Sequence, residues 1–166
     1  MIDKRSMLIG AGAAIAGRAL LPHVVLLKLR RDVRKLNDGD YGSLLSGYAD
    51  DAVLRFNEGP HRWSGEHRGK AAIERFLQNF TKAGVRGEIS KIWLAGPPWA
   101  MTMAVRFDDR ATGPDGEELY ANHVAMTVRT RWGRIVEHDD FYVDTARIVA
   151  FEEKLRALGV EPAMTR

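Results

Sequence analysis

The sequence predicts an α+β domain, a cone-shaped two-layer fold in which helices pack on a curved antiparallel sheet. Apolar residues recur with helical spacing up to about residue 83, and then alternate with a period of two through the later part of the chain. The 166 residues, 45% hydrophobic and 28% charged, have the composition of one globular domain. We therefore expect this domain over residues 23–166, with an extra N-terminal helical segment, residues 1–22, in front of it.

The N-terminal segment is apolar and basic. Lys4 and Arg5 precede the run 7–17, which is too short to cross a bilayer, whereas residues 7–29 reach the necessary length of about 20 if Arg18 is tolerated. Basic, apolar and small-residue regions in this order are also typical of a signal peptide. A helix packed on the domain or on a partner is the third alternative. All three stay open, and the predicted location is membrane-associated or cytoplasmic.

The charge belongs mainly to this end of the chain. Residues 1–36 carry eight Lys or Arg and two Asp, whereas residues 37–166 carry seventeen Lys or Arg and twenty Asp or Glu. The body has no basic stripe with interleaved aromatics, so no nucleic acid is expected as a partner. The sequence contains no cysteine, which excludes disulfides and thiolate metal sites, and its histidines lack metal-ligand spacing. We expect neither a metal nor a cofactor.

Helical periodicity predicts the elements of the first half. A helix from His23 ends at Asn37-Asp38-Gly39, and a second, short helix begins at Asp40 and includes Tyr48. A short strand over 52–56 and a polar loop over 57–69 follow. The clearest helix covers residues 70–83, with an apolar face that includes Phe80.

Alternation then predicts four strands and a closing helix. The strands are expected over 88–95, 99–107, 119–131 and 134–143, separated by turns at 96–98, 108–118 and 132–133. Apolar residues from Ile148 to Leu158 make the last helix, which stops at Gly159. A curved sheet under helices leaves room for a ligand pocket.

Three segments of this chain carry a recognisable pattern: LNDGDY with YADDAV at 36–41 and 48–53, GKAAI at 69–73, and GRIVEHDD at 133–140. In this order and spacing they resemble the SnoaL-like branch of the nuclear transport factor 2-like superfamily. The resemblance covers residues 25–145. It implies a cone-like, usually dimeric fold, in a group that includes polyketide cyclases, ketosteroid isomerases, epoxide hydrolases and non-catalytic binders.

The last predicted strand carries the candidate chemistry. Period-two geometry places His138, Asp140 and Tyr142 on one face of it and Asp139 on the other. A histidine, a carboxylate and a phenol on one concave wall can transfer protons to and from an organic substrate. The resemblance implies that Asp140 is the acid/base residue, although Asp139 replaces the tryptophan usual in those cyclases. Alternatively, these carboxylates are solvated or paired with an arginine.

Further candidates lie on other elements. His123, on the neighbouring strand, is expected either to orient Asp140 as a third catalytic group or to be a polar wall residue. Tyr48 either donates a hydrogen bond to a ligand or belongs to the core. His61 and Trp63 belong to a loop that is either a lid at the pocket mouth or a packed surface loop.

Apolar side chains complete the predicted pocket. Phe80 and Met103 are expected to contact the ligand, and Trp93, Trp99 and Met101 extend either this wall or a plain core or dimer face. Two functions remain open. The first is a cofactor-free isomerase, cyclase or hydrolase that binds a small hydrophobic molecule. The second is a non-catalytic binding or assembly module, a homodimer or part of a larger complex, attached to a membrane or a partner.

Overall fold

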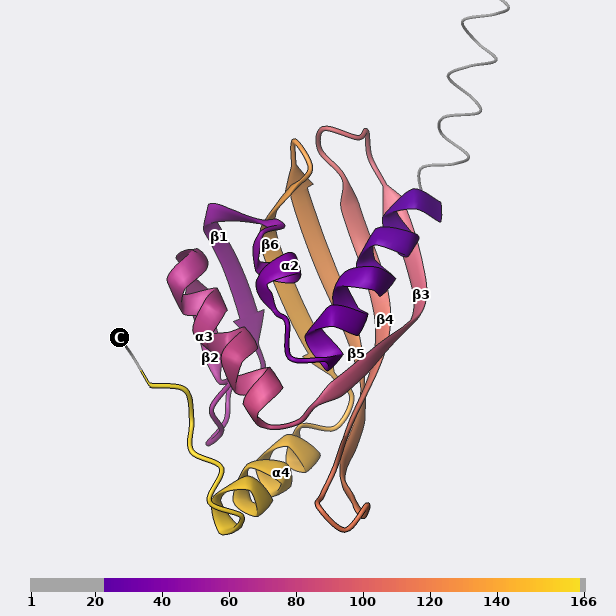
Figure 1. Ribbon diagram of the computed structural model, residues 1–166. Helices are drawn as coiled ribbons and strands as arrows, with labels where there is room; N and C mark the ends of the chain where they lie inside the picture. Colours follow the sequence, from indigo (N-terminus) through magenta and orange to yellow (C-terminus); the bar gives the residue numbers. More distant parts are fainter. Residues whose placement is uncertain (1–22, 165–166) are drawn as a thin grey trace, which may run out of the picture.

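Helices and a single sheet form two layers, with the helices on one face of the sheet (Figure 1). The computed structural model describes residues 23–164. The predicted segment 1–22 therefore lies outside the described residues, as does most of the predicted membrane-contacting stretch 7–29. Within residues 23–164, no helix is both long and apolar enough to cross a membrane.

The sheet has six strands in the order β2-β1-β6-β5-β4-β3. Four of the five neighbouring pairs are antiparallel, as predicted, and the pair β1–β6 is parallel. This parallel pair brings an early strand beside the last one. The strands are β1 (Tyr48–Phe56), β2 (Gly65–Arg68), β3 (Arg86–Ala95), β4 (Thr102–Thr112), β5 (Glu118–Arg131) and β6 (Arg134–Tyr142).

Four helices accompany the described part of the sheet. A helix over residues 23–37 runs along β3, and its last residue, Asn37, exchanges two hydrogen bonds with the backbone of Gly87, of 2.8 and 2.9 Å. A Cβ at Gly87 would overlap the ring of Phe107, so only glycine leaves room for this ring against β3. The other helices are α2 (Gly42–Leu45), α3 (Gly69–Lys82), which packs on β1, and α4 (Thr145–Ala157), which closes the opposite end (Figure 1).

Three predicted boundaries are wrong. The second helix is only the four residues of α2, and Tyr48 begins β1, where it pairs with Ile135 of β6. The predicted loop 57–69 contains β2, and β4 continues to Thr112 through residues predicted as a turn. In each case pairing with a neighbouring strand outweighs the local signal, because a strand is stabilised by its cross-strand partners.

Candidate functional site

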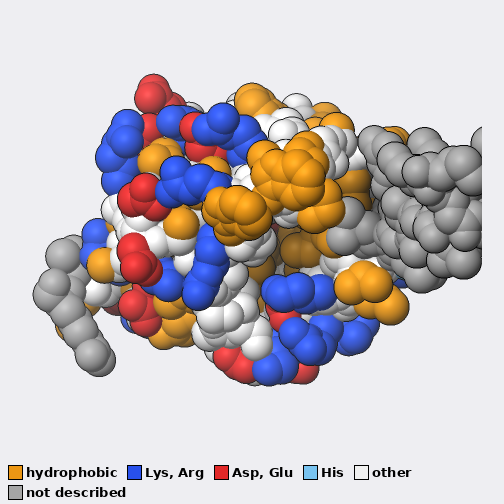
Figure 2. All heavy atoms as spheres, turned by 90° about the horizontal axis from the view of Figure 1, so that it is seen from above, with side chains coloured by type: hydrophobic (Ala, Val, Ile, Leu, Met, Phe, Trp, Pro, Cys, Tyr) orange, Lys and Arg blue, Asp and Glu red, His pale blue; other side chains and the backbone are white. Residues whose placement is uncertain are grey.

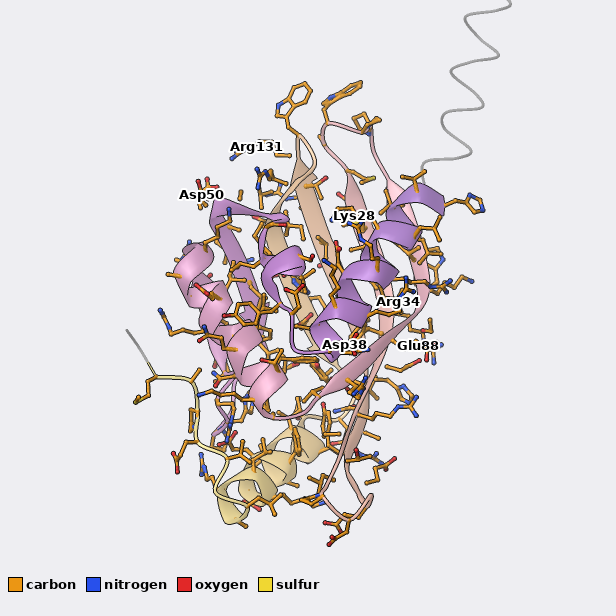
Figure 3. All side chains as sticks on the ribbon, in the orientation of Figure 1. Lys28, Arg34, Asp38, Asp50, Glu88 and Arg131 are labelled. Carbon is orange, nitrogen blue, oxygen red and sulfur yellow. The ribbon has the colours of Figure 1, made fainter. Side chains whose placement is uncertain are left out.

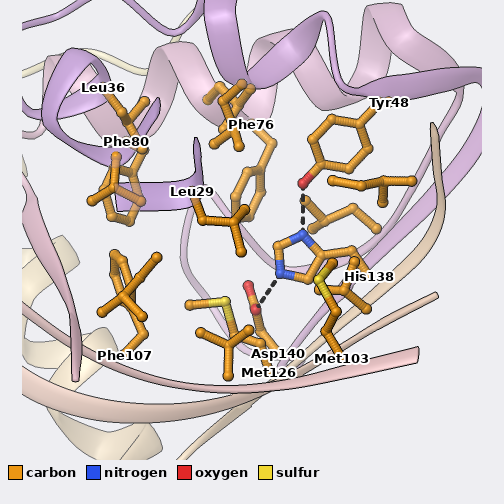
Figure 4. Close-up of a pocket in the computed structure, with 18 of the residues that line it drawn as sticks. Leu29, Leu36, Tyr48, Phe76, Phe80, Met103, Phe107, Met126, His138 and Asp140 are labelled. Carbon is orange, nitrogen blue, oxygen red and sulfur yellow. Dashed lines mark hydrogen bonds and ion pairs between the residues drawn. The ribbon is translucent and has the colours of Figure 1, made fainter. Parts of the chain in front are cut away.

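An apolar cavity of about 90 Å³ lies between the helices and the inner face of the sheet. Figure 4 shows aromatic and aliphatic side chains around it and three polar groups at one end. The predicted ligand contacts Phe80 and Met103 are among its walls. The lining residues come from the helix 23–37, α2, α3 and five strands: Leu29, Val33, Leu36, Leu44, Tyr48, Leu54, Phe76, Leu77, Phe80, Ile89, Met103, Val105, Phe107, Met126, Val128, Ile135, His138, Asp140 and Tyr142.

The polar groups form one hydrogen-bonded chain. Tyr48 Oη lies 2.6 Å from His138 Nδ1, and His138 Nε2 lies 2.8 Å from Asp140 Oδ1 (Figure 4). The side chains of His138 and Asp140 are only 13% and 7% exposed, and Tyr48 is fully buried. A buried carboxylate needs a partner, and here an imidazole supplies it.

The environment of His138 favours its charged form. Burial lowers the pKa of the imidazole, but the charge and hydrogen bond of Asp140, with the charge of Asp139, outweigh burial and raise the pKa above its usual value. Burial, followed by the charge of Asp140, raises the pKa of the Tyr48 hydroxyl, which stays protonated. His138 therefore holds a proton that it shares with Asp140.

The register of β6 explains why these groups face the cavity. His138 lies opposite Val128 and Asp140 opposite Met126 on β5, and both partners line the cavity. Asp139 points to the outer face, where its carboxylate accepts a 2.9 Å hydrogen bond from Arg55. The predicted separation of the two carboxylates is confirmed. The arginine-paired alternative describes Asp139 and not Asp140.

A second buried carboxylate, which sequence reasoning missed, lies beyond Tyr142. The Tyr142 hydroxyl donates to Asp109 Oδ2 at 2.7 Å, and Asp109 is 3% exposed. Burial, with the charge of Asp140, raises the pKa of Asp109 to about 7, although the hydrogen bond from Tyr142 opposes this. Alternate residues of β4 face inward, so Asp109 lies on the same face as Met103 and Phe107. This alternation is the feature of the sequence from which the position of Asp109 could have been predicted.

The prediction that His123 orients Asp140 is wrong. His123 lies on the outer face of β5, with its side chain 63% exposed and its Nδ1 2.6 Å from Asp108 Oδ1. Its neighbour Val124 pairs with Tyr142 and faces inward, so His123 must face outward. The group that orients Asp140 is His138, two residues away on the same strand.

His61 and Trp63 do not line the main cavity. Both are buried, and Trp63 stacks on Phe151 of α4 with ring centroids 6.0 Å apart. Between them Arg62 forms a buried ion pair with Glu152 of α4, with Nε 2.8 Å from Oε2. Of the two alternatives for this loop, the structure has the packed loop, held on α4 by this ion pair and by the Trp63–Phe151 contact.

Two of the predicted apolar residues, Trp93 and Trp99, are not part of the cavity wall. Trp93 and Trp99 are 50% and 54% exposed, and neither lines the cavity, whereas Met101 and Met103 are buried as predicted. Trp93 pairs with Ala104 on the outer face of the sheet, and Trp99 lies in the turn before β4. Among the described residues, no cluster of His, Asp and Glu has the geometry to hold a metal ion.

Residues 29–138 match the family model of the SnoaL-like domain. The chain belongs to the SnoaL-like domain family. The match begins in the helix 23–37 and ends at His138, so it includes both Tyr48 and the imidazole that Tyr48 contacts. A comparison with curated proteins finds no match for this SnoaL-like chain.

Solved structures share the fold of this SnoaL-like domain. TerC, co-crystallised with polyporic acid, has a TM-score of 0.61 at 20% identity, over 80% of this chain and 98% of TerC. A putative isomerase from Bacillus subtilis has a TM-score of 0.59 at 19% identity, over 82% and 94%. A nuclear transport factor 2-like protein from Anabaena variabilis has 0.55 at 17%, over 75% and 90%. At these identities the likeness shows the fold alone.

Proposed function

We propose that this SnoaL-like domain binds a small, largely apolar organic molecule and moves a proton on it without a cofactor. The observation that carries the proposal is the buried chain of Tyr48, His138 and Asp140 at the polar end of an apolar cavity. Apolar walls with a few convergent polar groups are typical of small-molecule sites. The similar fold of a protein co-crystallised with polyporic acid, and of a putative isomerase, agrees with a ligand of this class.

Asp140 is the proposed general base. Its Oδ1 is held by His138 Nε2, while Oδ2 has no hydrogen-bond partner among the described residues and remains available to a ligand. A carboxylate that takes a proton from carbon leaves negative charge on the substrate, and the proton shared with His138 lies close enough to balance it. Tyr48 fixes the imidazole ring from the other side. Isomerisation or ring closure through an enolate fits these groups.

The size of the cavity limits the ligand. An apolar cavity of about 150 Å³ accommodates benzene, so a ring enters the 90 Å³ cavity only if its walls move. Met103 and Met126 line it, and unbranched thioether side chains adjust more easily than branched ones. We therefore expect small cyclic ketones or phenols to bind more tightly than extended polycyclic molecules.

A second candidate is a non-catalytic binding module. The apolar, basic sequence of residues 1–36 favours it, because proton transfer within the cavity needs no such segment. In that case Asp140 and His138 only anchor a polar group of the ligand. The two candidates differ in a single measurable step, which is the exchange of a carbon-bound proton.

The experiment follows this step without knowledge of the natural substrate. Cyclopentanone, cyclohexanone and their unsaturated analogues are incubated with the protein in D2O, and loss of the α-proton signal is followed by NMR. We expect exchange above the buffer rate with the native protein, and a loss of about 10²–10⁴-fold with Asp140→Asn.

Asp139→Asn is the matched control. It removes the adjacent carboxylate, which lies on the outer face with Arg55, and it should lower the rate far less than Asp140→Asn does, because Asp139 acts on His138 only through its charge. Equal exchange by the native protein and Asp140→Asn would exclude Asp140 as the base. Ligand-induced NMR shifts of His138 without any exchange would favour the binding module.

A further inference from the structure

Three of the four tryptophans are exposed near one end of the sheet. Trp132, in the β5–β6 turn, is 78% exposed, and its amide donates to Trp99 O at 2.9 Å, which joins the two hairpin tips. Trp93 lies near the same end of β3. Figure 2, seen from this end, shows hydrophobic side chains gathered around a hollow. We call the exposed set Val24, Leu27, Trp93, Trp99 and Trp132 the tryptophan end.

The helix 23–37 places its apolar residues at the same end. It runs antiparallel to β3, since Asn37 bonds Gly87 and Arg30 reaches Ile89 O, and its first turns lie beside the end of β3 that leads into the β3–β4 turn (Figure 1). Val24 and Leu27 there are 60% and 67% exposed. The described helix thus begins at the tryptophan end, and the sequence before residue 23 contains the apolar run 7–17.

The β5–β6 turn carries Trp132 at a local cost. Arg131 pairs with Arg134, so the turn has two residues, Trp132 and Gly133, with φ of 50° and 76°. Such turns favour Asn-Gly, because positive φ is unfavourable for bulky side chains. Trp132 also packs little of its surface against the protein. Packing among the described residues therefore gives no reason for a tryptophan at this position.

Basic residues surround the tryptophan end. Lys91 Nζ lies 5.1 Å from the Trp93 ring, and Arg131 and Lys28 lie toward this end in Figure 3. Some acidic partners are present, with Asp51 3.5 Å from Arg131 and Asp32 2.6 Å from Lys28. Asp50 also lies toward this end, but residues 23–31, the part of the helix nearer to it, carry three Lys or Arg and no Asp or Glu. The surroundings of the tryptophans are therefore positive.

We propose that the tryptophan end docks on an anionic lipid bilayer, with Trp99 and Trp132 at the level of the headgroups. Indole rings gather at membrane interfaces, because one end of the ring is apolar and its N–H is polar. Lys and Arg near the surface add attraction to anionic lipid, about fivefold in affinity for each charge. The hollow in this face then opens toward the lipid, which is the phase where apolar ligands accumulate.

The test uses the full chain and vesicles of phosphatidylcholine with or without 30% phosphatidylglycerol. Binding is measured by flotation, and indole depth by quenching with lipids that carry a nitroxide near the headgroup or deep in the acyl chain. We expect tighter binding to the anionic vesicles, a blue shift of tryptophan emission, and stronger quenching by the shallow label.

The decisive variant is Trp99→Ser with Trp132→Asn. Asparagine tolerates the positive φ at position 132, so the fold is preserved and its melting temperature should rise. Affinity for vesicles should fall at least about tenfold, because the inserted apolar area is lost. Leu158→Ser, 49% exposed beyond α4 at the opposite end, is the matched control and should bind as the native chain does.

The charge contribution is tested separately. Lys91→Gln with Arg131→Gln should weaken binding to anionic vesicles about 25-fold and leave binding to neutral vesicles unchanged. Arg110→Gln, at the far end of β4, is the control.

Two results would overturn the proposal. If the double tryptophan variant floats as the native chain does and the indoles are not quenched, the N-terminal segment acts alone. The second result is that vesicle binding is the same for every variant and every lipid composition, while the tryptophan substitutions abolish a dimer in sedimentation equilibrium. A second copy of the chain would then cover this surface.

Discussion

Two buried carboxylates lie on the inner face of the same sheet, and they differ in their partners. Asp140 contacts an imidazole that can carry positive charge, at 2.8 Å. Asp109 contacts the Tyr142 phenol, at 2.7 Å, and no cation among residues 23–164. The imidazole gains a proton next to Asp140, whereas the pKa of Asp109 itself rises to about 7. Where burial is similar, the chemistry of the partner therefore decides which group of a pair holds the proton.

The largest expected effect comes from removal of the imidazole. His138→Leu leaves Asp140 buried and unpaired, which should lower the free energy of unfolding by about 3–5 kcal/mol at pH 8. Urea unfolding followed by circular dichroism measures it. The double variant His138→Leu, Asp140→Asn removes the charge as well and should recover most of the loss. A small effect of the single variant would mean that the pair is not coupled.

The next largest effect is the pH dependence of stability that Asp109 causes, and it distinguishes Asp109 from Asp140. Its folded pKa, about 7, lies above the unfolded value of 3.8, so the folded state binds more protons between these values and stability falls as pH rises from about 4 to 7. The loss amounts to roughly 4 kcal/mol. Asp109→Asn should flatten this part of the stability profile and stabilise the protein at pH 8.

The contribution of His138 to the same profile lies at higher pH. Its folded pKa is raised above 6.5, so its contribution is present below pH 6.5 and is lost as pH rises through the folded value. In Asp109→Asn this later decline should remain. If Asp109→Asn abolished both falls in stability, Asp109 and His138 would titrate as one coupled system.

Removal of the phenol beside His138 should have a smaller effect. Tyr48→Phe leaves His138 Nδ1 buried without a partner, at a cost of about 1–3 kcal/mol in urea unfolding. Tyr41→Phe is the control, because its hydroxyl bonds Glu74 and Gln78 at a half-buried position. Its cost should stay below about 1 kcal/mol. Equal costs would mean that Tyr48 matters only by packing.

The smallest expected effect is a change in the pKa of Asp109 when the Tyr142 hydroxyl is removed. Tyr142→Phe removes the hydrogen bond that lowers the pKa of Asp109, so this pKa should rise further, by less than about one unit. Carbon NMR titration of the carboxyl group measures it directly. A fall in the pKa would show that the phenol does not stabilise the ionised carboxylate.

Of the two buried carboxylates, the sequence allowed only Asp140 to be placed correctly. Period-two alternation in the last strand correctly placed His138 and Asp140 on the inner face, because the register shift in this strand lies before them, between Ile135 and Glu137. The same rule, applied to Val124 and Met126, would have placed His123 outside. Asp109 escaped because Gly113 and Pro114 suggested a turn that began too early, and a polar residue interrupts the apolar pattern that marks an inward position.

Tyr48 illustrates a different limit. Its spacing from Leu44 and Leu45 fits a helix, and polar residues follow it, so no local pattern marks the start of β1. The strand forms because β6 lies beside it, with a register shift between Tyr48 and Val53. Parallel pairing of distant segments leaves no local signature in a sequence. The contact between Tyr48 and His138 was therefore beyond prediction from periodicity.

The parallel pairing of β1 and β6 also sets when the site can exist during protein synthesis. Tyr48 and His138 are 90 residues apart along the chain, an interval that a ribosome translates in about 5 to 20 seconds. Until β6 emerges, β1 has only β2 as a neighbour on the nascent chain, and its inner edge is an open template for pairing. The last strand thus completes the polar site and covers this edge in one step.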